Sequence, residues 1–375
     1  MSCPLPVLSR CDTMRRIIAH KKKWDEEGVA STVGTIMGLL IFLTFLSLIV
    51  NSYVPVWMKD SESSHMNVAY GQFGDFKESI DTQMLYARMS ELAGVHFTPT
   101  TIFTPIALGL DGVPIFSSPT LGLLTVDQAK APWNAWFGYY PNKVVNVKQV
   151  VNESAGGYVR LDVYNRYFVP QTLAYENGGV LKAQSDGMVL RAEPTFDITF
   201  VNNTEEITLV MITMLGYGSI QGSTTEGIHA KVISASMDEY KRVWTDVSLN
   251  HTTPFGLAWW GYYNKTLSDL FGITPDRYMP PNLCTPDNPS NPGYPGYCYT
   301  QQSVPVYGRI PRMVRSPYFK IDLTLNQTSL DFRIVITFKN DYSNIYARMM
   351  PIKTLRIMKV VVNTAVGGIG SLVDI

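Results

Sequence analysis

The chain has 375 residues, of which 46% are hydrophobic and 17% charged, and its 31 basic and 31 acidic side chains cancel. A neutral chain of this composition gives no electrostatic reason to expect a nucleic-acid partner. Its length and apolar content are enough for one large core or two ordinary ones.

A long uncharged stretch lies near the start of the chain. No Asp, Glu, Lys, Arg or His occurs from Val29 to Met58, and a helix needs only about 20 apolar residues to cross a hydrocarbon layer. A cleaved secretory signal has a shorter apolar core, of about 7 to 15 residues, and a buried helix of a soluble protein does not need so long an uncharged run. We therefore predict a membrane-spanning helix over 29–58.

Charge is distributed asymmetrically around this stretch. Basic residues gather before it, at Arg10, Arg15, Arg16, Lys21, Lys22 and Lys23. Because basic flanks stay on the inner side of a membrane, residues 1–28 are predicted to be a cytoplasmic leader and the rest an extracellular part of a single-pass protein in the cell membrane. Trp24, Tyr53 and Trp57 suit the two headgroup levels, so membrane lipid is a predicted partner. Pro55 predicts a kink near the outer boundary.

A helical pattern continues beyond the span. Between residues 59 and 94, apolar side chains recur in steps of three and four, at Met66, Tyr70, Phe73, Phe76, Ile80 and Met84. This period is typical of an amphipathic helix. We interpret it as a stalk that continues the membrane helix and packs its apolar stripe on the extracellular part.

Residues 95–245 and 316–375 have the composition of strands. Segments 158–165 and 195–216 are rich in β-branched and aromatic residues. Segment 100–118 is predicted to be a hairpin of two strands around an Asp111-Gly112 turn. Alternating apolar residues over 319–323 and 330–336 indicate half-buried antiparallel strands. The stretch "GYGSIQG", 216–222, is interpreted as a loop between strands. The predicted fold class is mainly β, a membrane helix and a stalk helix followed by a large antiparallel β-sandwich-type ectodomain with one or two short helices.

A helix and a loop between cysteines interrupt the strands at residues 246–315. Thr253 can cap the helix, Pro254 suits its first position, and Gly272 suits the position after its end. Its predicted apolar face consists of Leu257, Trp260, Tyr263, Leu267, Leu270 and Phe271. Cys284 and Cys298 bracket a Pro/Gly/Asn-rich segment that cannot hold itself together by packing, so we predict a disulfide, with two free thiols as the alternative. Residues 241–315, which include this helix and loop, are interpreted as a seam between two β regions.

Two aromatic stretches nearly repeat each other, "AWFGYYPNK" at 135–143 and "AWWGYYNK" at 258–265. Exposed aromatic rings can stack on sugar rings, so the rings around the first stretch are a candidate sugar platform, namely Trp133, Trp136, Tyr139 and Tyr140. Packing in a core is the alternative explanation, and in the second stretch the helical spacing favours it. Surface glycans are accordingly candidate partners.

Five N-x-S/T sequons lie in the predicted extracellular part and are candidates for N-glycosylation. They are Asn152, Asn202, Asn250, Asn264 and Asn326. Residues for catalysis are scattered, since the histidines stand singly without metal-ligand spacing and no nucleophile elbow occurs. We predict no enzyme, no metal and no cofactor, although distant carboxylates of a membrane-tethered hydrolase could meet in the fold.

The N-terminal organisation resembles a known family. A basic tail, the acidic turn "DEEG" and the run "VASTVGTIMGLLIFLTFLSLIV", continuing into an amphipathic helix, are similar over about residues 15–90 to archaeal type IV pilin-like and archaellin-like proteins. The resemblance implies leader processing between Gly28 and Val29. Val33 stands where many pilins have a glutamate. Gly34 and Gly38 lie one turn apart, and such small residues allow close packing against other pilin-type subunits.

We therefore expect a membrane-anchored archaeal cell-surface protein of pilin-like type, structural or adhesive and non-catalytic. A ligand- or carbohydrate-binding surface module is the alternative, and a membrane-tethered hydrolase is less favoured. An extracellular part of this size looks more like the head of a minor pilin than like a major pilin. The sequence leaves open whether the leader is removed and whether the chain forms filaments or remains a monomeric anchor.

Overall fold

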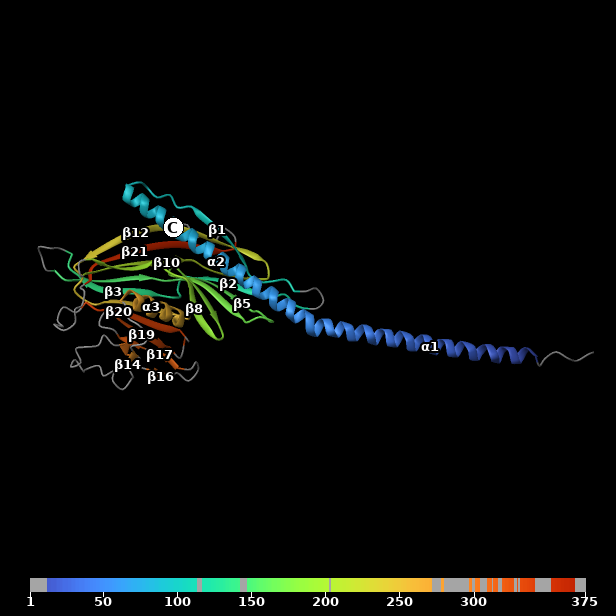
Figure 1. Cartoon of the computed structure of the whole chain (residues 1–375). Coiled ribbons are helices and arrows are strands. Elements are labelled where there is room, and N and C mark those ends of the chain that lie inside the picture. Colours follow the sequence, from blue (N-terminus) through green and yellow to red (C-terminus); the bar gives the residue numbers. More distant parts are fainter. Residues whose placement is uncertain are drawn as a thin grey trace, which may run out of the picture.

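A computed structural model describes residues 12–112, 117–141, 147–201, 204–271, 319–326, 329, 331–340 and 352–367, with short strand segments at 278–279, 297–298, 301–303, 309–311 and 313–315. Side chains are described from residue 30 onward, outside 272–318. The molecule consists of a long helical rod and a β-rich head, by which we mean residues 97–367 (Figure 1).

The rod is built from three consecutive helical elements, α1 (Asp12–Leu48), a short π-helix (Ile49–Tyr53) and α2 (Val54–Ala93). In Figure 1, α1 projects away from the head and α2 lies along it. Pro55 sits in the first turn of α2, directly after the π-helix, in which the Val54 N–H donates to the Ile49 carbonyl. Because proline cannot donate a backbone hydrogen bond, the change to π geometry accommodates it without ending the rod.

The head is mainly β, as its composition predicts, and its main strands form three sheets. The first sheet has the order β1 (Thr101–Ala107), β12 (Thr225–Lys241), β21 (Ile352–Val366), β10 (Thr204–Leu215), β9 (Phe196–Val201). The second has the order β11 (Tyr217–Gly222), β2 (Gly122–Asp127), β5 (Tyr158–Val163), β6 (Gln171–Glu176), β7 (Gly179–Gln184), β8 (Gly187–Ala192).

The third sheet has the order β18 (Met313–Arg315), β19 (Phe319–Leu325), β20 (Phe332–Phe338), β13 (Val247–Thr253), β3 (Trp133–Tyr139), β4 (Gln149–Ala155). Two minor pairs are β14 (Tyr278–Met279) with β15 (Tyr297–Cys298), and β16 (Gln301–Ser303) with β17 (Arg309–Pro311). Helix α3 (Gly256–Leu270) contributes to the same core as this sheet.

Two apolar cores lie on opposite faces of the first sheet, which gives the head its sandwich-like layers. Along β10, Val210 and Ile212 join the core shared with α2 and the second sheet, whereas Leu209 and Met211 join the core shared with α3 and the third sheet. Burial on both faces explains the one departure from antiparallel pairing among the long strands, since β10 runs parallel to β21 and parallel pairs occur where both faces are covered.

Two predictions about strands are corrected by the structure. The segment 216–222, expected to be a loop, is the edge strand β11, whose backbone pairs with β2 from Tyr217 to Gly222. The predicted hairpin around Asp111 and Gly112 is not formed by β1, because β1 pairs with the distant β12. After β1, Leu110 makes a single bridge to Thr120, and residues 113–116 lie outside the described part.

The predicted helix at 253–272 is present with shifted bounds. Thr253 ends β13, and α3 begins at Gly256, so Pro254 lies before the helix and not in its first turn. The helix turns Trp259 into the core and leaves Trp260, which was predicted on the apolar face, at the margin of the core. Strand β13 lies between β3 and β20, so the predicted seam does not separate two packed units. Gly272 lies outside the described residues.

Candidate functional site

The segment of the rod from Val33 to Leu48 exposes an apolar surface. Between residues 33 and 48 all large apolar side chains except the half-buried Leu46 are 47% to 66% exposed, namely Val33, Ile36, Met37, Leu39, Leu40, Ile41, Phe42, Leu43, Phe45 and Leu48. The described part of the chain has one helix that is long and apolar enough to cross a membrane, and it includes this segment. Exposure of so many apolar side chains to water would be costly, so this surface requires an apolar surrounding.

The predicted helix-packing glycines lie on this exposed surface. A Cβ atom added at Gly34 or at Gly38 would meet no atom within 4 Å. A larger side chain therefore fits at either position in a single copy of the chain. The predicted processing residues, Gly28 and Val29, lie within the backbone of α1, and their side-chain surroundings are outside the described part.

Helix α2 packs its apolar stripe into the head. Phe73, Phe76 and Ile80 are completely buried, and the Phe76 ring meets the Tyr175 ring of β6 edge to face at 5.2 Å. The stripe covers β1 and β12 of the first sheet and reaches β6 and β7 of the second. Because the same helical rod emerges as the exposed apolar segment, the head and that segment are joined without a flexible linker (Figure 1).

A buried carboxyl group binds the N-terminal part of α2 to the head. Glu62 is fully buried, and its two oxygens accept hydrogen bonds from the Thr120 hydroxyl at 2.6 Å and from three successive backbone N–H groups of residues 166–168 at 2.6 to 3.0 Å. Four converging donors match the acceptor capacity of one carboxylate. The loop after β5 is therefore held directly on the rod.

Two glutamines and a histidine of α2 also form hydrogen bonds to backbone groups of the head. The Gln72 side-chain oxygen accepts the Ala107 N–H at 2.8 Å, and the His65 Nε2 donates to the Ala107 carbonyl at 3.0 Å. Farther along, the Gln83 amide donates to the Thr100 carbonyl at 2.7 Å while its oxygen accepts the Val232 N–H at 3.1 Å. These side chains bond backbone groups of residues 100, 107 and 232, in or next to strands β1 and β12 of the first sheet. They therefore fix where α2 lies along these two strands.

A second buried carboxyl group lies inside the head. Glu176 accepts hydrogen bonds from the Thr253 hydroxyl at 2.8 Å and the Trp259 indole N–H at 2.6 Å, and it also bonds the Nε2 of His251. The other ring nitrogen of His251, Nδ1, donates to the Pro132 carbonyl at 3.1 Å. With Nδ1 bonded to a carbonyl, the opposite ring nitrogen is directed at the Glu176 carboxyl, so the ring is held from both sides.

Local sequence explains why these groups meet. Glu176 directly precedes the turn Asn177-Gly178, whose two φ angles, 44° and 81°, fit the tight hairpin that joins β6 to β7. Strand alternation places His251 and Thr253 on the buried face of β13. The cluster is completely enclosed, and the His251 ring stacks on Trp133 at 4.0 Å. It links β6, β13 and α3, and it is a packing element of the core without access for a substrate.

The four rings of the predicted sugar platform do not form one surface. Trp133 is 3% exposed and stacks in the core, whereas Trp136, three residues later on β3, is 45% exposed on the opposite face. Tyr139 is half-buried and donates its hydroxyl to Gln149, and Tyr140 lies beside Trp244. Strand alternation separates the rings, because successive side chains point to opposite faces of a sheet.

Trp136 nevertheless lies in a polar hollow of about 410 Å³ on the outer face of the third sheet. It faces Asn152 of β4 and Ser248 of β13 in register. The rest of the lining is Asn134, Asn250, Arg333 and Val335. One exposed aromatic ring among amide, hydroxyl and guanidinium groups can offer both stacking and hydrogen bonds to a polyhydroxylated ligand.

The described sequons occupy different environments. Asn152 and Asn326 are exposed, the first in β4 and the second just after β19. Asn250 is half-buried and its side-chain oxygen accepts the Arg333 Nε–H at 3.0 Å, while Asn264 lies within α3. Asn202 lies outside the described residues. Glycan attachment at these positions stays a prediction.

The predicted disulfide cannot be placed on the structure. Cys284 lies outside the described residues, and Cys298 is described only as backbone of β15. The pairing of the two thiols therefore stays a prediction. Within the described part of the chain, no group of three or more His, Cys, Asp or Glu side chains is arranged to hold a metal ion.

Comparisons with known proteins add no relative: no family model, no curated protein and no solved structure matches this chain.

Sequence reasoning missed the buried carboxyl groups because their partners are distant along the chain. Glu62 is bonded by residues 58 to 106 positions away, and Glu176 by residues 75 to 83 positions away. Two signals were nevertheless present. The Asn177-Gly178 pair predicts a hairpin, and the alternation of β13 puts His251 on an apolar face.

Proposed function

We propose that the chain is a membrane-anchored surface protein of pilin-like type, in which the N-terminal helix crosses the membrane and presents the β-rich head outside the cell. Its role is structural or adhesive. The basic residues before the apolar segment support a cytoplasmic N-terminus. The resemblance of the N-terminal region to archaeal pilin-like proteins supports processing between Gly28 and Val29.

The observation that carries this proposal is the division of one continuous rod into two surfaces. From Val33 to Leu48 nearly all of its large apolar side chains are exposed, and from Met58 to Ala87 its apolar stripe is buried in the head. A hydrophobic anchor alone would need no rigid connection. Hydrogen bonds from Glu62, Gln72 and Gln83 fix the position of the head relative to the membrane helix. A fixed position of this kind is expected for the stalk of a subunit that assembles with others.

The mature N-terminus of protein isolated from native membranes tests the family assignment. We expect Val29 as the first residue. An intact Met1 would instead indicate a permanent anchor without leader processing.

A crosslinking experiment tests assembly separately. A cysteine at Ile41, in a background lacking the native cysteines, should crosslink neighbouring copies, since Gly34, Gly38 and Ile41 lie on one side of a helix. Gly34→Leu should reduce crosslinking, because the added side chain meets nothing in its own chain and would clash only with a neighbour. Thr32→Leu adds bulk to the opposite side and is the matched control. Equal crosslinking in both variants would count against assembly through this face.

Saccharide binding on the third sheet is a second candidate function. It is favoured by the exposed Trp136 ring in its polar hollow, next to two amide side chains, Asn134 and Asn152, that can bond sugar hydroxyls. Both a pilin-like protein and a saccharide-binding surface protein would present this face outside the cell.

A further inference from the structure

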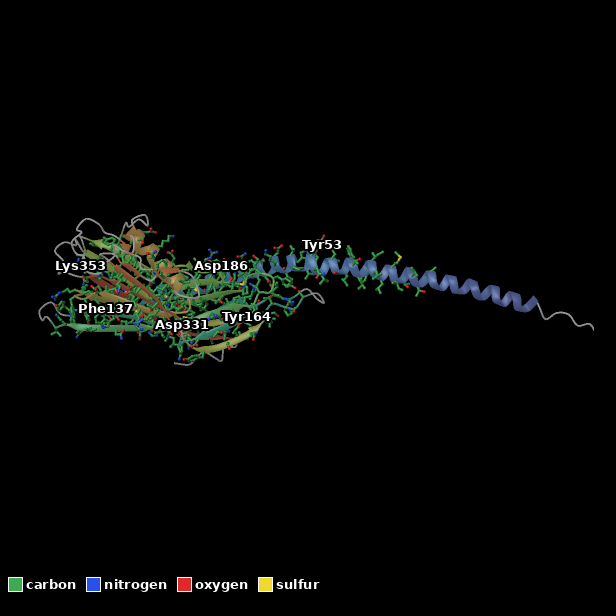
Figure 2. The ribbon with its side chains drawn as sticks, turned by 90° about the horizontal axis from the view of Figure 1, so that it is seen from below. Tyr53, Phe137, Tyr164, Asp186, Asp331 and Lys353 are labelled. Atoms are coloured by element: carbon green, nitrogen blue, oxygen red, sulfur yellow. The ribbon has the colours of Figure 1, made fainter. Side chains whose placement is uncertain are left out.

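Two of the sequons meet at the hollow that surrounds Trp136. Asn152 of β4 and Asn250 of β13 both line it, and their strands pair with β3 on either side. Figure 2 labels Phe137, the neighbour of Trp136 on β3, in the part of the head remote from Tyr53 on the rod. The hollow therefore lies well away from the apolar segment of the rod.

Asn152 has the geometry of a glycan acceptor. Its side chain and that of Ser154, the hydroxyl residue of the same sequon, are both exposed. They point to the same face of the sheet because they are two positions apart on one strand. Strand β4 is the edge strand of the third sheet, and the Asn152 side-chain amide makes no hydrogen bond in the described part of the chain. Both functional groups of the sequon are therefore accessible to a transferring enzyme.

The second sequon of the hollow is less accessible. Asn250 is half-buried on β13, an interior strand of the sheet, and its side-chain oxygen accepts the Arg333 Nε–H at 3.0 Å. A glycan on Asn250 would have to displace this bond between β13 and β20. Of the two asparagines, the geometry therefore favours Asn152.

The Trp136 ring is placed to receive the first sugar of a glycan on Asn152. The two residues lie directly opposite each other on antiparallel strands, where Cβ atoms are about 4.5 to 5.5 Å apart. Trp136 is 45% exposed, so apolar ring surface is open to the C–H groups of a sugar. The Asn134 amide and the Ser248 hydroxyl also line the hollow and can bond sugar hydroxyls. Its volume of about 410 Å³ is within the range of small-molecule sites.

We propose that Asn152 carries an N-linked glycan whose first sugar stacks on Trp136 and occupies this hollow. In the transfer, the Asn152 amide nitrogen forms a bond with the anomeric carbon of an oligosaccharide linked to a lipid phosphate. The bond from that carbon to the phosphate oxygen breaks, the lipid phosphate leaves, and the amide nitrogen gives one proton to the transferring enzyme. The inference rests on the proposed function, because glycosylation requires the head to be outside the cell.

The attached glycan and a free saccharide exclude each other in the hollow. Binding of a saccharide from solution is therefore expected only of chains that lack the glycan on Asn152. In both cases a sugar ring contacts Trp136, so the experiment has to separate an attached sugar from a free one.

The test combines glycopeptide mapping with hydroxyl-radical footprinting of the full chain isolated from native membranes. Mapping should find a glycan on Asn152. A sugar stacked on one of the two faces of the Trp136 ring should slow oxidation of that ring about twofold relative to Ser154→Ala, which lacks the sequon. Ser154→Thr keeps the sequon and should keep both the glycan and the slow oxidation. Oxidation of Tyr217, 60% exposed on β11, should be equal in all three chains, which excludes a folding defect.

A control variant separates this glycan from glycans elsewhere on the head. Thr328→Ala removes the sequon of Asn326 and should leave the oxidation of Trp136 unchanged. Equal oxidation of Trp136 in the native chain and in Ser154→Ala would overturn the proposal, and a free saccharide in the hollow would give this result because it needs no sequon.

Protease digestion on intact cells separates this inference from the proposed function. A head that is digested while Asn152 is unmodified would overturn the glycan alone. A head that is protected until the cells are lysed would overturn the proposed function together with the glycan.

Discussion

Glu62 offers the sharpest test of how the rod is joined to the head. Glu62→Gln preserves the size of the side chain but replaces one oxygen by an NH2 group. One oxygen accepts from the Thr120 hydroxyl and the Arg166 N–H, and the other accepts from the N–H groups of Tyr167 and Phe168. The best position of the NH2 group is beside Thr120, whose hydroxyl can turn and accept.

The cost of this substitution follows from the bonds that remain. The Arg166 N–H then faces the NH2 group and stays buried without an acceptor, which costs about 1 to 3 kcal/mol. The bonds to Tyr167 and Phe168 change from charge-assisted to neutral and lose roughly half of their strength. We expect a total loss of about 3 kcal/mol in the free energy of unfolding, concentrated where the loop after β5 meets α2.

The assay combines denaturant unfolding of the full chain in detergent with hydrogen exchange at residues 166–168. Exchange there should accelerate about a hundredfold. Glu78→Gln is the matched control, because Glu78 is exposed on the same helix, and it should change stability by less than about 0.5 kcal/mol. If both variants were equally stable and the exchange rates unchanged, Glu62 would not fasten the rod as described.

Two further predictions concern the head. Burial raises the pKa of Glu205 from 4.5 to about 8, so the folded state holds this proton more tightly than the unfolded state, and stability present below pH 4.5 is lost as pH rises through 8. Glu205→Gln should remove this loss and make the protein about 4 kcal/mol more stable than the native chain at pH 8, whereas equal pH profiles in denaturant unfolding would contradict it. Trp136→Ala should weaken retention on an immobilised neutral polysaccharide about tenfold, with the exposed Tyr217→Ala as control. Equal retention of the two variants would remove saccharide binding from the third sheet.

Much of the secondary structure could be predicted because its signals are local. The uncharged run after Val29 predicts a long apolar helix from composition alone. Alternation predicts the strands β19 and β20 with bounds that differ by at most two residues. A prediction was wrong where the residue types of a segment favour a loop but its backbone pairs with a distant strand. The glycines of 216–222 suggest a loop, yet the backbone of this segment completes the ladder on β2.

The candidate sites could be predicted only in part, for a geometric reason. Trp136 was selected as a stacking ring by residue type alone. That Trp133 lies on the other face follows from strand alternation, once residues 133–139 are known to be a strand. The hollow around Trp136 also needs residues of β4, β13 and β20, and the order in which those strands pair has no local signature.

The sequence by itself determined the parts of this protein whose physics is confined to near neighbours along the chain, which are the apolar helix, the β-rich composition and the alternating strands. Only the tertiary structure decided what lies together. It joined Glu62 to residues 166–168, Glu176 to His251 and Trp259, and Tyr140 to Arg242 and Lys353. Hydrogen bonds and charge pairing act over a few ångströms in space, whatever the separation along the chain, so these sites exist only after the sheets have formed.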